Sequence, residues 1–183
     1  MTDDQDKDLL KRFRDSPSRN MAFNELVNRY QERLYWHIRR IVIDHDDADD
    51  VLQNTFIKAF ENLDKFREDS QLFTWLYRIA TNESLSFLKK KKKNVFVSMD
   101  DVSRQLSSTL ESAPELSGDA IQLKLQRAIL TLPTKQRLVF NMKYFDEMKY
   151  EEIAQVTGTS VGALKASYHH AVKKIEAYVK SQF

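Results

Sequence analysis

Apolar residues recur at three- and four-residue steps along most of the chain, which is the period of an amphipathic α-helix. Between Met21 and Val42 they define one helix face, which we expect to be buried. A second helix is predicted after the acidic turn Asp44 to Asp47, because carboxylates complement the positive end of a helix dipole. A third follows the polar break at Arg67 to Ser70 and continues into a lysine run. The pattern predicts an N-terminal bundle of three helices.

The helical period is lost between residues 95 and 119, where Ser, Asp and Glu gather around Pro114 and Gly118. Few large apolar side chains are present there, which is typical of a flexible linker. Apolar periodicity resumes at Ile121 and is broken once more at Pro133. We therefore predict an all-α fold of two small helical domains, with residues 9–94 and 120–183 joined by the linker 95–119.

The strongest local pattern is a helix-turn-helix between Tyr150 and Ile175. Gly158 can adopt the left-handed conformation that ends one helix, and Ser160 can cap the next. Inward positions at helical spacing are Val161, Leu164, Tyr168, Ala171, Val172 and Ile175. The outward positions are then free to face a major groove. The alternative is an ordinary helical hairpin with a solvated face; the glycine turn, the serine cap and the positive outer face favour DNA binding.

Composition supports helices and excludes several classes of protein. Only three Gly and three Pro are present, and no Cys, so disulfides and thiolate metal sites are excluded. No run of about 18 apolar residues occurs, and Met1 to Asp8 is too polar for a signal peptide. We expect a cytoplasmic protein without a membrane segment, cofactor or metal.

Charge is segregated along the chain although the net charge is only +2. Lys89 to Lys93 form an unbroken basic run, whereas the linker is acidic. We expect two independent helical modules, and an acidic flexible linker that lets them close on each other in solution and mask their basic DNA-facing surfaces.

Three stretches in their joint order resemble the bacterial RNA polymerase sigma factors of the extracytoplasmic-function group. They are ADDVLQNTFIKAFENLDKF at Ala48 to Phe66, TWLYRIATN at Thr74 to Asn82, and the stretch from Leu132 to Ile175. The resemblance implies sigma regions 2 and 4, and a protein that binds core RNA polymerase, carries it to a promoter and helps open the DNA. It also implies no catalytic activity and control by an anti-sigma factor.

Carried over residue by residue, the resemblance also implies which side chains make contact. Core polymerase would meet Asp49, Asp50, Gln53 and Asn54, although the family usually has an acidic residue where Asn54 stands. Single-stranded minus-10 DNA would meet aromatic and cationic groups. These candidates are Phe66, Arg67, Ser70, Arg78, Asn82, Lys89, Lys90 and Lys91. Trp75, Leu76 and Ile79 are expected in the core instead.

The second helix of the helix-turn-helix would read the minus-35 element. The implied contacts are Ala163, Lys165, Ala166, Ser167, His169, His170 and Lys173. Many relatives have arginine where Ser167, His170 and Val172 stand, so the arginines that grip guanine bases are missing here. We expect a different or weaker minus-35 preference. The adjacent histidines splay apart and favour phosphate or base contact over metal ligation.

Two alternatives compete with this interpretation. His45 beside Asp46 resembles part of a metal-dependent phosphohydrolase site, but that half has no second histidine at ligand spacing and no glycine-rich phosphate loop. A conventional helix-turn-helix transcription regulator with an N-terminal sensing or dimerisation domain shares the C-terminal pattern. The acidic helix, the aromatic and basic helix and the linker favour the sigma factor.

Overall fold

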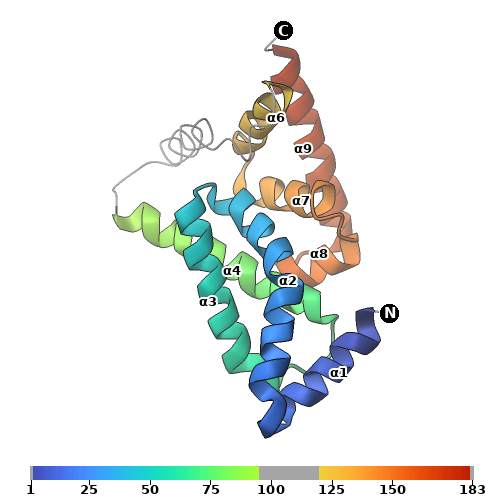
Figure 1. Cartoon of the computed structure of the whole chain (residues 1–183). Helices are drawn as coiled ribbons and strands as arrows, with labels where there is room; N and C mark the ends of the chain where they lie inside the picture. Colours follow the sequence, from blue (N-terminus) through green and yellow to red (C-terminus); the bar gives the residue numbers. More distant parts are fainter. Residues whose placement is uncertain (1, 95–119, 182–183) are drawn as a thin grey trace.

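The computed structural model describes residues 2–94 and 120–181, and within these ranges every regular element is helical (Figure 1). The N-terminal half contains α1 (Thr2–Arg14), α2 (Arg19–Val42), α3 (His45–Asn62) and α4 (Leu72–Asn94), with short 3-10 turns η1 (Ser16–Ser18) and η2 (Leu63–Lys65). The C-terminal half contains α6 (Ala120–Leu130), α7 (Thr134–Tyr144), α8 (Tyr150–Thr157) and α9 (Val161–Ser181). The predicted all-α class is confirmed. The predicted linker, 95–119, lies outside the described residues.

The α2–α3 pair forms the centre of the N-terminal half. Leu26, Leu34 and Ile38 of α2 are completely buried at helical spacing. The inward face of α3 carries smaller side chains, among them Ala48 and Ala59, so the two helices can pack closely. The start of α3 is fixed by Asp44, whose carboxylate accepts a hydrogen bond from the Asp47 amide at 3.0 Å.

A helix that the sequence analysis did not predict precedes this bundle. α1 buries Leu9, Leu10 and Phe13 against it. The Asp6 carboxylate accepts hydrogen bonds from Arg29 Nη1 and from the hydroxyl of the buried Tyr30, both at 2.6 Å. Burial, and secondarily the bond to Asp6, raises the pKa of Tyr30, so its hydroxyl remains a donor at neutral pH.

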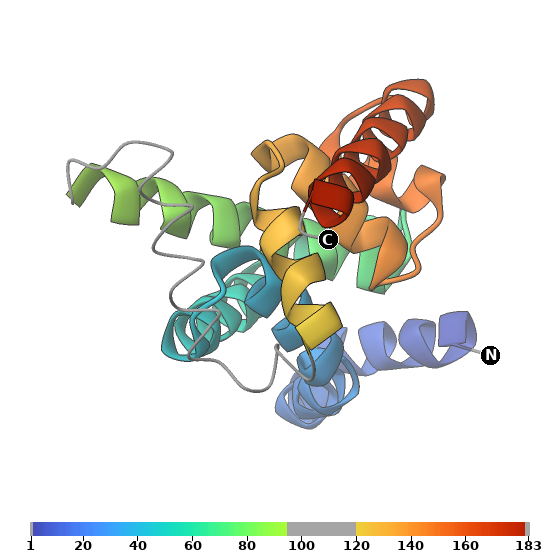
Figure 2. The same cartoon turned by 90° about the horizontal axis from the view of Figure 1, so that it is seen from above.

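The two halves pack directly against each other: α8 lies on α4 and α7 contacts α2 (Figures 1 and 2). A single apolar core contains Leu76 and Tyr77 of α4 together with Leu138 of α7 and Val156 of α8. The expectation of two independent modules is therefore wrong for this arrangement, because they share a core. No helix within the described ranges is long and apolar enough to cross a membrane.

Candidate nucleic-acid and partner interfaces

The outward face of α3 carries the four residues proposed to contact core polymerase. Asp49, Asp50, Gln53 and Asn54 are all exposed, along one side of a helix whose opposite side is buried. Near the helix start, His45 Nδ1 is hydrogen-bonded to the Tyr35 hydroxyl at 2.6 Å, and His45 Nε2 lies 3.5 Å from Asp49 Oδ2. The described part of the chain contains no group of three potential His, Cys, Asp or Glu metal ligands. His45 is thus part of a surface hydrogen-bond network at the start of α3.

An apolar groove of about 400 Å³ lies beside this face, and the sequence analysis did not assign it. Gln53 lines it and connects it to the acidic stretch, while Ile57 is 49% exposed at its rim. The remaining lining residues are Phe23, Val27, Phe56, Phe60 and Glu61. The phenylalanines fall on helical spacing and therefore resembled core residues. Ile57, which interrupts the polar face, was the signal that could have revealed the groove.

Phe66, proposed to stack on unpaired minus-10 bases, does not have the exposed ring that this role assumes. Its residue is 6% exposed, and its ring packs on Trp75 with centroids 5.1 Å apart. Its carbonyl accepts a hydrogen bond from Arg14 of α1 at 3.0 Å. Arg67, next along the chain, is highly exposed and pairs with Asp69 at 3.0 Å. The expected exposed ring is wrong here because Phe66 closes the core behind α1, whereas the side chain of Arg67 is exposed.

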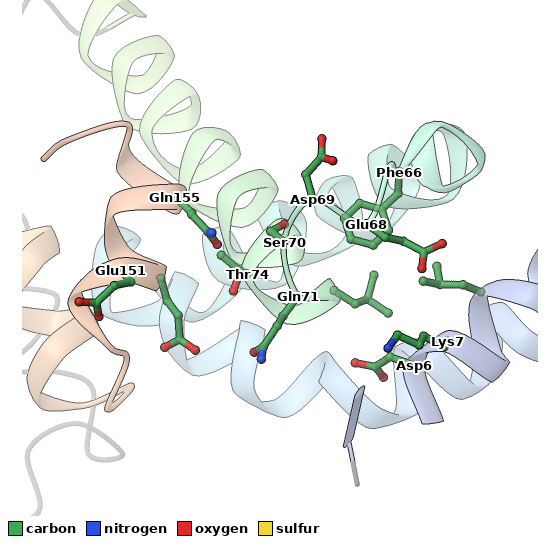
Figure 3. Close-up of a pocket in the computed structure, with 13 residues that line it drawn as sticks. Asp6, Lys7, Phe66, Glu68, Asp69, Ser70, Gln71, Thr74, Glu151 and Gln155 are labelled. Atoms are coloured by element: carbon green, nitrogen blue, oxygen red, sulfur yellow. The ribbon is translucent and has the colours of Figure 1, made fainter. Parts of the chain in front are cut away.

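The loop between η2 and α4 borders a cleft of about 500 Å³ (Figure 3). α1 lines one side, and Glu151 and Gln155 of α8 line another. Ser70, a candidate for minus-10 DNA, is half-buried in this cleft. Its surroundings are acidic, since Glu68 and Asp69 of the same loop also line the cleft. The C-terminal half therefore lies close to one of the candidate DNA contacts.

The other minus-10 candidates lie on the surface of α4. Arg78 and Asn82 are exposed, and Lys89 and Lys90 are exposed near the helix end. Lys91 pairs with Asp47 of α3 at 2.6 Å, so part of the basic run is held against the acidic start of α3. The buried positions also agree with the sequence: Leu76 is completely buried, and Trp75 and Ile79 pack partly buried against the core.

The helix-turn-helix has the predicted geometry. Gly158 ends α8 with φ at 68°, and the Ser160 hydroxyl accepts a long hydrogen bond of 3.4 Å from the Ala163 amide at the start of α9. Leu164, Ala171 and Ile175 are buried, as predicted. The exposed outward residues are Ala163, Lys165, Ala166, His169, His170 and Lys173, whereas Ser167 is half-buried. The structure thus gathers most of the minus-35 candidates on one face of α9.

A tyrosine that the sequence analysis did not single out supports this face. The Tyr150 ring lies 5.1 Å from the Lys143 ammonium and 5.8 Å from that of Lys165. Such contacts attract a cation to the face of the ring. Burial, with a smaller effect of Tyr168, raises the pKa of Tyr150, so the hydroxyl stays neutral beside the two lysines. Tyr150 therefore helps to hold Lys165 at the outward face of α9.

Although we expect the closed modules to mask their basic DNA-facing surfaces, the packing of the halves leaves these surfaces exposed. Arg78 and Asn82 on α4 remain exposed, as do Lys165 and Lys173 on α9. From the C-terminal half the contact uses α7, α8, the turn between them and Leu130 of α6, none of which belongs to a proposed DNA-facing strip. The expected masking is wrong for these residues: the basic side chains at the contact are Arg40 and His37 of α2, whereas the proposed DNA-facing residues of α4 and α9 lie outside it.

Comparisons with known proteins agree with this arrangement. The family model for Sigma-70 region 2 matches residues 26–94, and that for Sigma-70 region 4 matches residues 122–175. The ECF RNA polymerase sigma factor SigW of Bacillus subtilis is 33% identical over 156 residues, which cover 81% of this chain and 83% of that protein. The RNA polymerase sigma-H factor of Pseudomonas aeruginosa is 32% identical over 186 residues, covering 96% and 94%. The solved structure of CnrH in complex with the cytosolic domain of CnrY has a TM-score of 0.67 and 26% identity, covering 90% and 91% of the two chains.

Proposed function

Because the chain belongs to the extracytoplasmic-function group of RNA polymerase sigma factors, we propose that it binds core RNA polymerase, directs it to promoters with minus-35 and minus-10 elements, and assists DNA opening. The observation that carries the proposal is the pairing, in one chain, of an exposed acidic helix face on α3 with an exposed cationic face on α9. The protein acts in the cytoplasm and has no catalytic step of its own.

The α3 face is suited to a protein partner. Carboxylates at Asp49 and Asp50 can pair with basic side chains, while the groove beside Gln53 offers apolar surface for burial. Protein interfaces combine an apolar centre with a polar rim in this way. We assign the groove, together with Asp49, Asp50, Gln53 and Asn54, to the contact with core polymerase.

The basic faces are suited to DNA. Small Ala163 and Ala166 allow α9 to approach base edges, and Lys165 and Lys173 can contact phosphates. In the loop before α4, Arg67 can hold the unpaired minus-10 strand together with Arg78, Asn82 and the lysine run of α4. Ser70 and Phe66 would join them only after a change at the loop, because both line the cleft that α8 borders.

An anti-sigma partner is part of the same proposal. CnrH, similar over nine tenths of this chain, was solved with a second protein, the cytosolic domain of CnrY. A regulator that covers the α3 groove would exclude core polymerase by occupying the same apolar surface.

Transcription in vitro tests the function directly. Core polymerase would be mixed with genomic DNA fragments, with and without the purified chain, and the new RNA 5′ ends sequenced. We expect start sites that appear only with the chain and share two upstream elements. The rival, a conventional helix-turn-helix regulator, predicts operator binding by a dimer without polymerase and no new start sites.

Two variants separate the two interfaces. Ile57→Lys places a charge in the apolar groove and should abolish association with core polymerase, whereas Ser181→Lys, which adds the same charge at the end of α9, should not. Lys165→Ala should leave polymerase association intact but weaken promoter binding and lower its salt dependence by about one ion. Lys180→Ala, the same change in the last turn of α9, is the control. If Lys165→Ala and Lys180→Ala weakened promoter binding equally, this would argue against recognition of the minus-35 element by the outward face of α9.

A further inference from the structure

One buried charge joins the two halves of the molecule. Asp146 stands in the turn between α7 and α8, and its side chain is 4% exposed. Its carboxylate meets two residues of α2: Oδ2 lies 2.8 Å from His37 Nδ1, and Oδ1 accepts from Arg40 Nη1 at 2.9 Å. His37 has a fully buried side chain. Both of these contacts cross between the halves.

Both ring nitrogens of His37 have hydrogen-bond partners, which fixes the orientation of the ring toward Asp146. Its second ring nitrogen, Nε2, lies 2.9 Å from the Thr81 hydroxyl of α4, and that hydroxyl donates to the Tyr77 carbonyl at 2.7 Å. With the Thr81 proton used in this way, the Thr81 oxygen is the acceptor that faces Nε2, and the Asp146 carboxylate is the acceptor that faces Nδ1. Arg40 adds a charge-assisted hydrogen bond to the same carboxylate.

The turn that carries Asp146 is built to hold it. The amides of Phe145 and Asp146 both donate to the Asn141 carbonyl, at 2.9 and 3.2 Å. The Phe145 ring lies under the Arg40 guanidinium, with the centroid 4.7 Å from Cζ. Arg40 thus contacts two successive residues of the turn. This fixes the carboxylate on the same side as α2.

A second contact between the halves lies at the end of α2. Ile43, a β-branched residue, has φ at 68°, in the left-handed region that such residues avoid. It is 2% exposed and clusters with Leu130 of α6. Hydrogen bonds from the Ile43 amide to the Arg39 carbonyl and from the Asp44 amide to the Val42 carbonyl, both 2.9 Å, form this turn, and Leu130 packs on it from the C-terminal half.

With the halves packed together, the molecule is too short to contact the minus-35 and minus-10 elements at the same time. By the positions in their names, the minus-35 and minus-10 elements are about 25 base pairs apart, which is ~85 Å at 3.4 Å per base pair. A compact globule of 183 residues has a radius of gyration of about 16 Å, hence a diameter of about 40 Å. The faces of α4 and α9 cannot reach both elements while the halves share a core. Separation must precede promoter engagement.

We infer that Asp146, held between His37 and Arg40, is an interdomain latch that keeps the free protein in this short form and must release when polymerase separates the halves. The inference rests on the proposed function for its purpose, but the latch itself can be measured without polymerase or DNA. A latched form lowers the apparent affinity for polymerase by the fraction of molecules that are open.

The latch can be tested with paired spin labels. Since the chain contains no cysteine, Gln71→Cys and Gln155→Cys place labels only at these positions, which line the same cleft from opposite halves. We expect a short, narrow distance distribution without further change. Asp146→Ala and Asp146→Asn should shift it to long, broad distances, whereas Glu147→Gln, which neutralises the neighbouring residue, should not. Helical circular dichroism close to that of the unchanged chain establishes that the variants are folded.

Affinity for core polymerase from Bacillus subtilis supplies the second readout. Asp146→Ala should bind about tenfold more tightly, which corresponds to ~1.4 kcal/mol, and Glu147→Gln should bind as the unchanged chain does. Arg40→Ala should act in the same direction, and with Asp146 already removed it should add little. Unchanged label distances in both Asp146 variants overturn the latch, and so do open halves without any gain in affinity. If the unchanged chain fails to bind polymerase, the proposed function fails, while the label distances still decide whether the latch exists.

Discussion

The two halves of the molecule differ in how far they can stand alone. The N-terminal half supplies most of the shared core from its own helices, and Leu9, Phe13 and Leu34 of α1 and α2 are completely buried in it. The C-terminal half divides its apolar residues. A small cluster around Phe140 and Ala171 belongs to it alone, whereas Val139, Ile153 and Leu164 belong to the core that continues into the N-terminal half. We infer that the C-terminal half depends on its neighbour for part of its stability.

This difference also locates function. In the N-terminal half, the packed helices hold α3 and α4 in place, and these two helices carry the proposed polymerase and minus-10 surfaces. The C-terminal half is held by a contact that can be exchanged, since a polymerase surface could cover the same apolar residues. A region that must move is expected to have fewer buried apolar contacts within itself.

The largest expected effect is local to the C-terminal half. Phe140→Ala removes a ring that stacks on Tyr144 and Tyr168, with centroids 5.2 and 5.8 Å away. Large-to-small changes of this kind cost about 3–5 kcal/mol. Both tryptophans lie in the N-terminal half, so in a Trp36→Phe background the fluorescence of Trp75 reports that half alone. We expect helicity to fall at lower urea than Trp75 fluorescence; coincident transitions would contradict the proposed difference.

Leu34→Ala should act on the whole molecule. Leu34 is completely buried in the centre of α2, so the change should cost about 2–4 kcal/mol. Because the C-terminal half rests on this core, helicity and Trp75 fluorescence should be lost together at reduced urea. Met21→Ala, on the same helix but 72% exposed, should shift the midpoint little. Survival of the C-terminal helices after fluorescence is lost would show that they stand alone.

A smaller effect is expected at α1. Asp6→Ala removes the acceptor of Arg29 and of the Tyr30 hydroxyl, leaving a buried donor unsatisfied at a cost of about 1–3 kcal/mol. Hydrogen exchange should show faster opening of α1 with little change in α3. Asp4→Ala, on an exposed residue of the same helix, provides the control. If α1 stayed as protected as before, the anchor would lie elsewhere, in Leu9 and Phe13.

The sequence patterns predict most of the helices but not which helices pack against one another. Periodicity placed α2, α3, α4 and α9 because each buries a long apolar face. α1 escaped because it buries only three large apolar side chains, Leu9, Leu10 and Phe13, and because its polar anchors, such as Asp6 with Arg29, join distant positions. Periodicity also shows that Tyr77 or Val156 points inward without showing which helix it meets. The contact between the halves, the burial of Phe66 and the apolar groove therefore required the structure.

The smallest effect concerns the two glycines of the helix-turn-helix. Gly158 has φ at 68° and open space where a Cβ would lie, so Gly158→Ala should cost only the left-handed strain of about 1 kcal/mol. Gly162, inside α9 and equally open, has ordinary helical geometry, so Gly162→Ala should stabilise by up to about 0.5 kcal/mol. Urea midpoints of the C-terminal transition should thus move in opposite directions from one identical change. Movement in the same direction would mean that the turn after α8 is not held in its left-handed form, and that α9 is not fixed relative to α8 by this glycine.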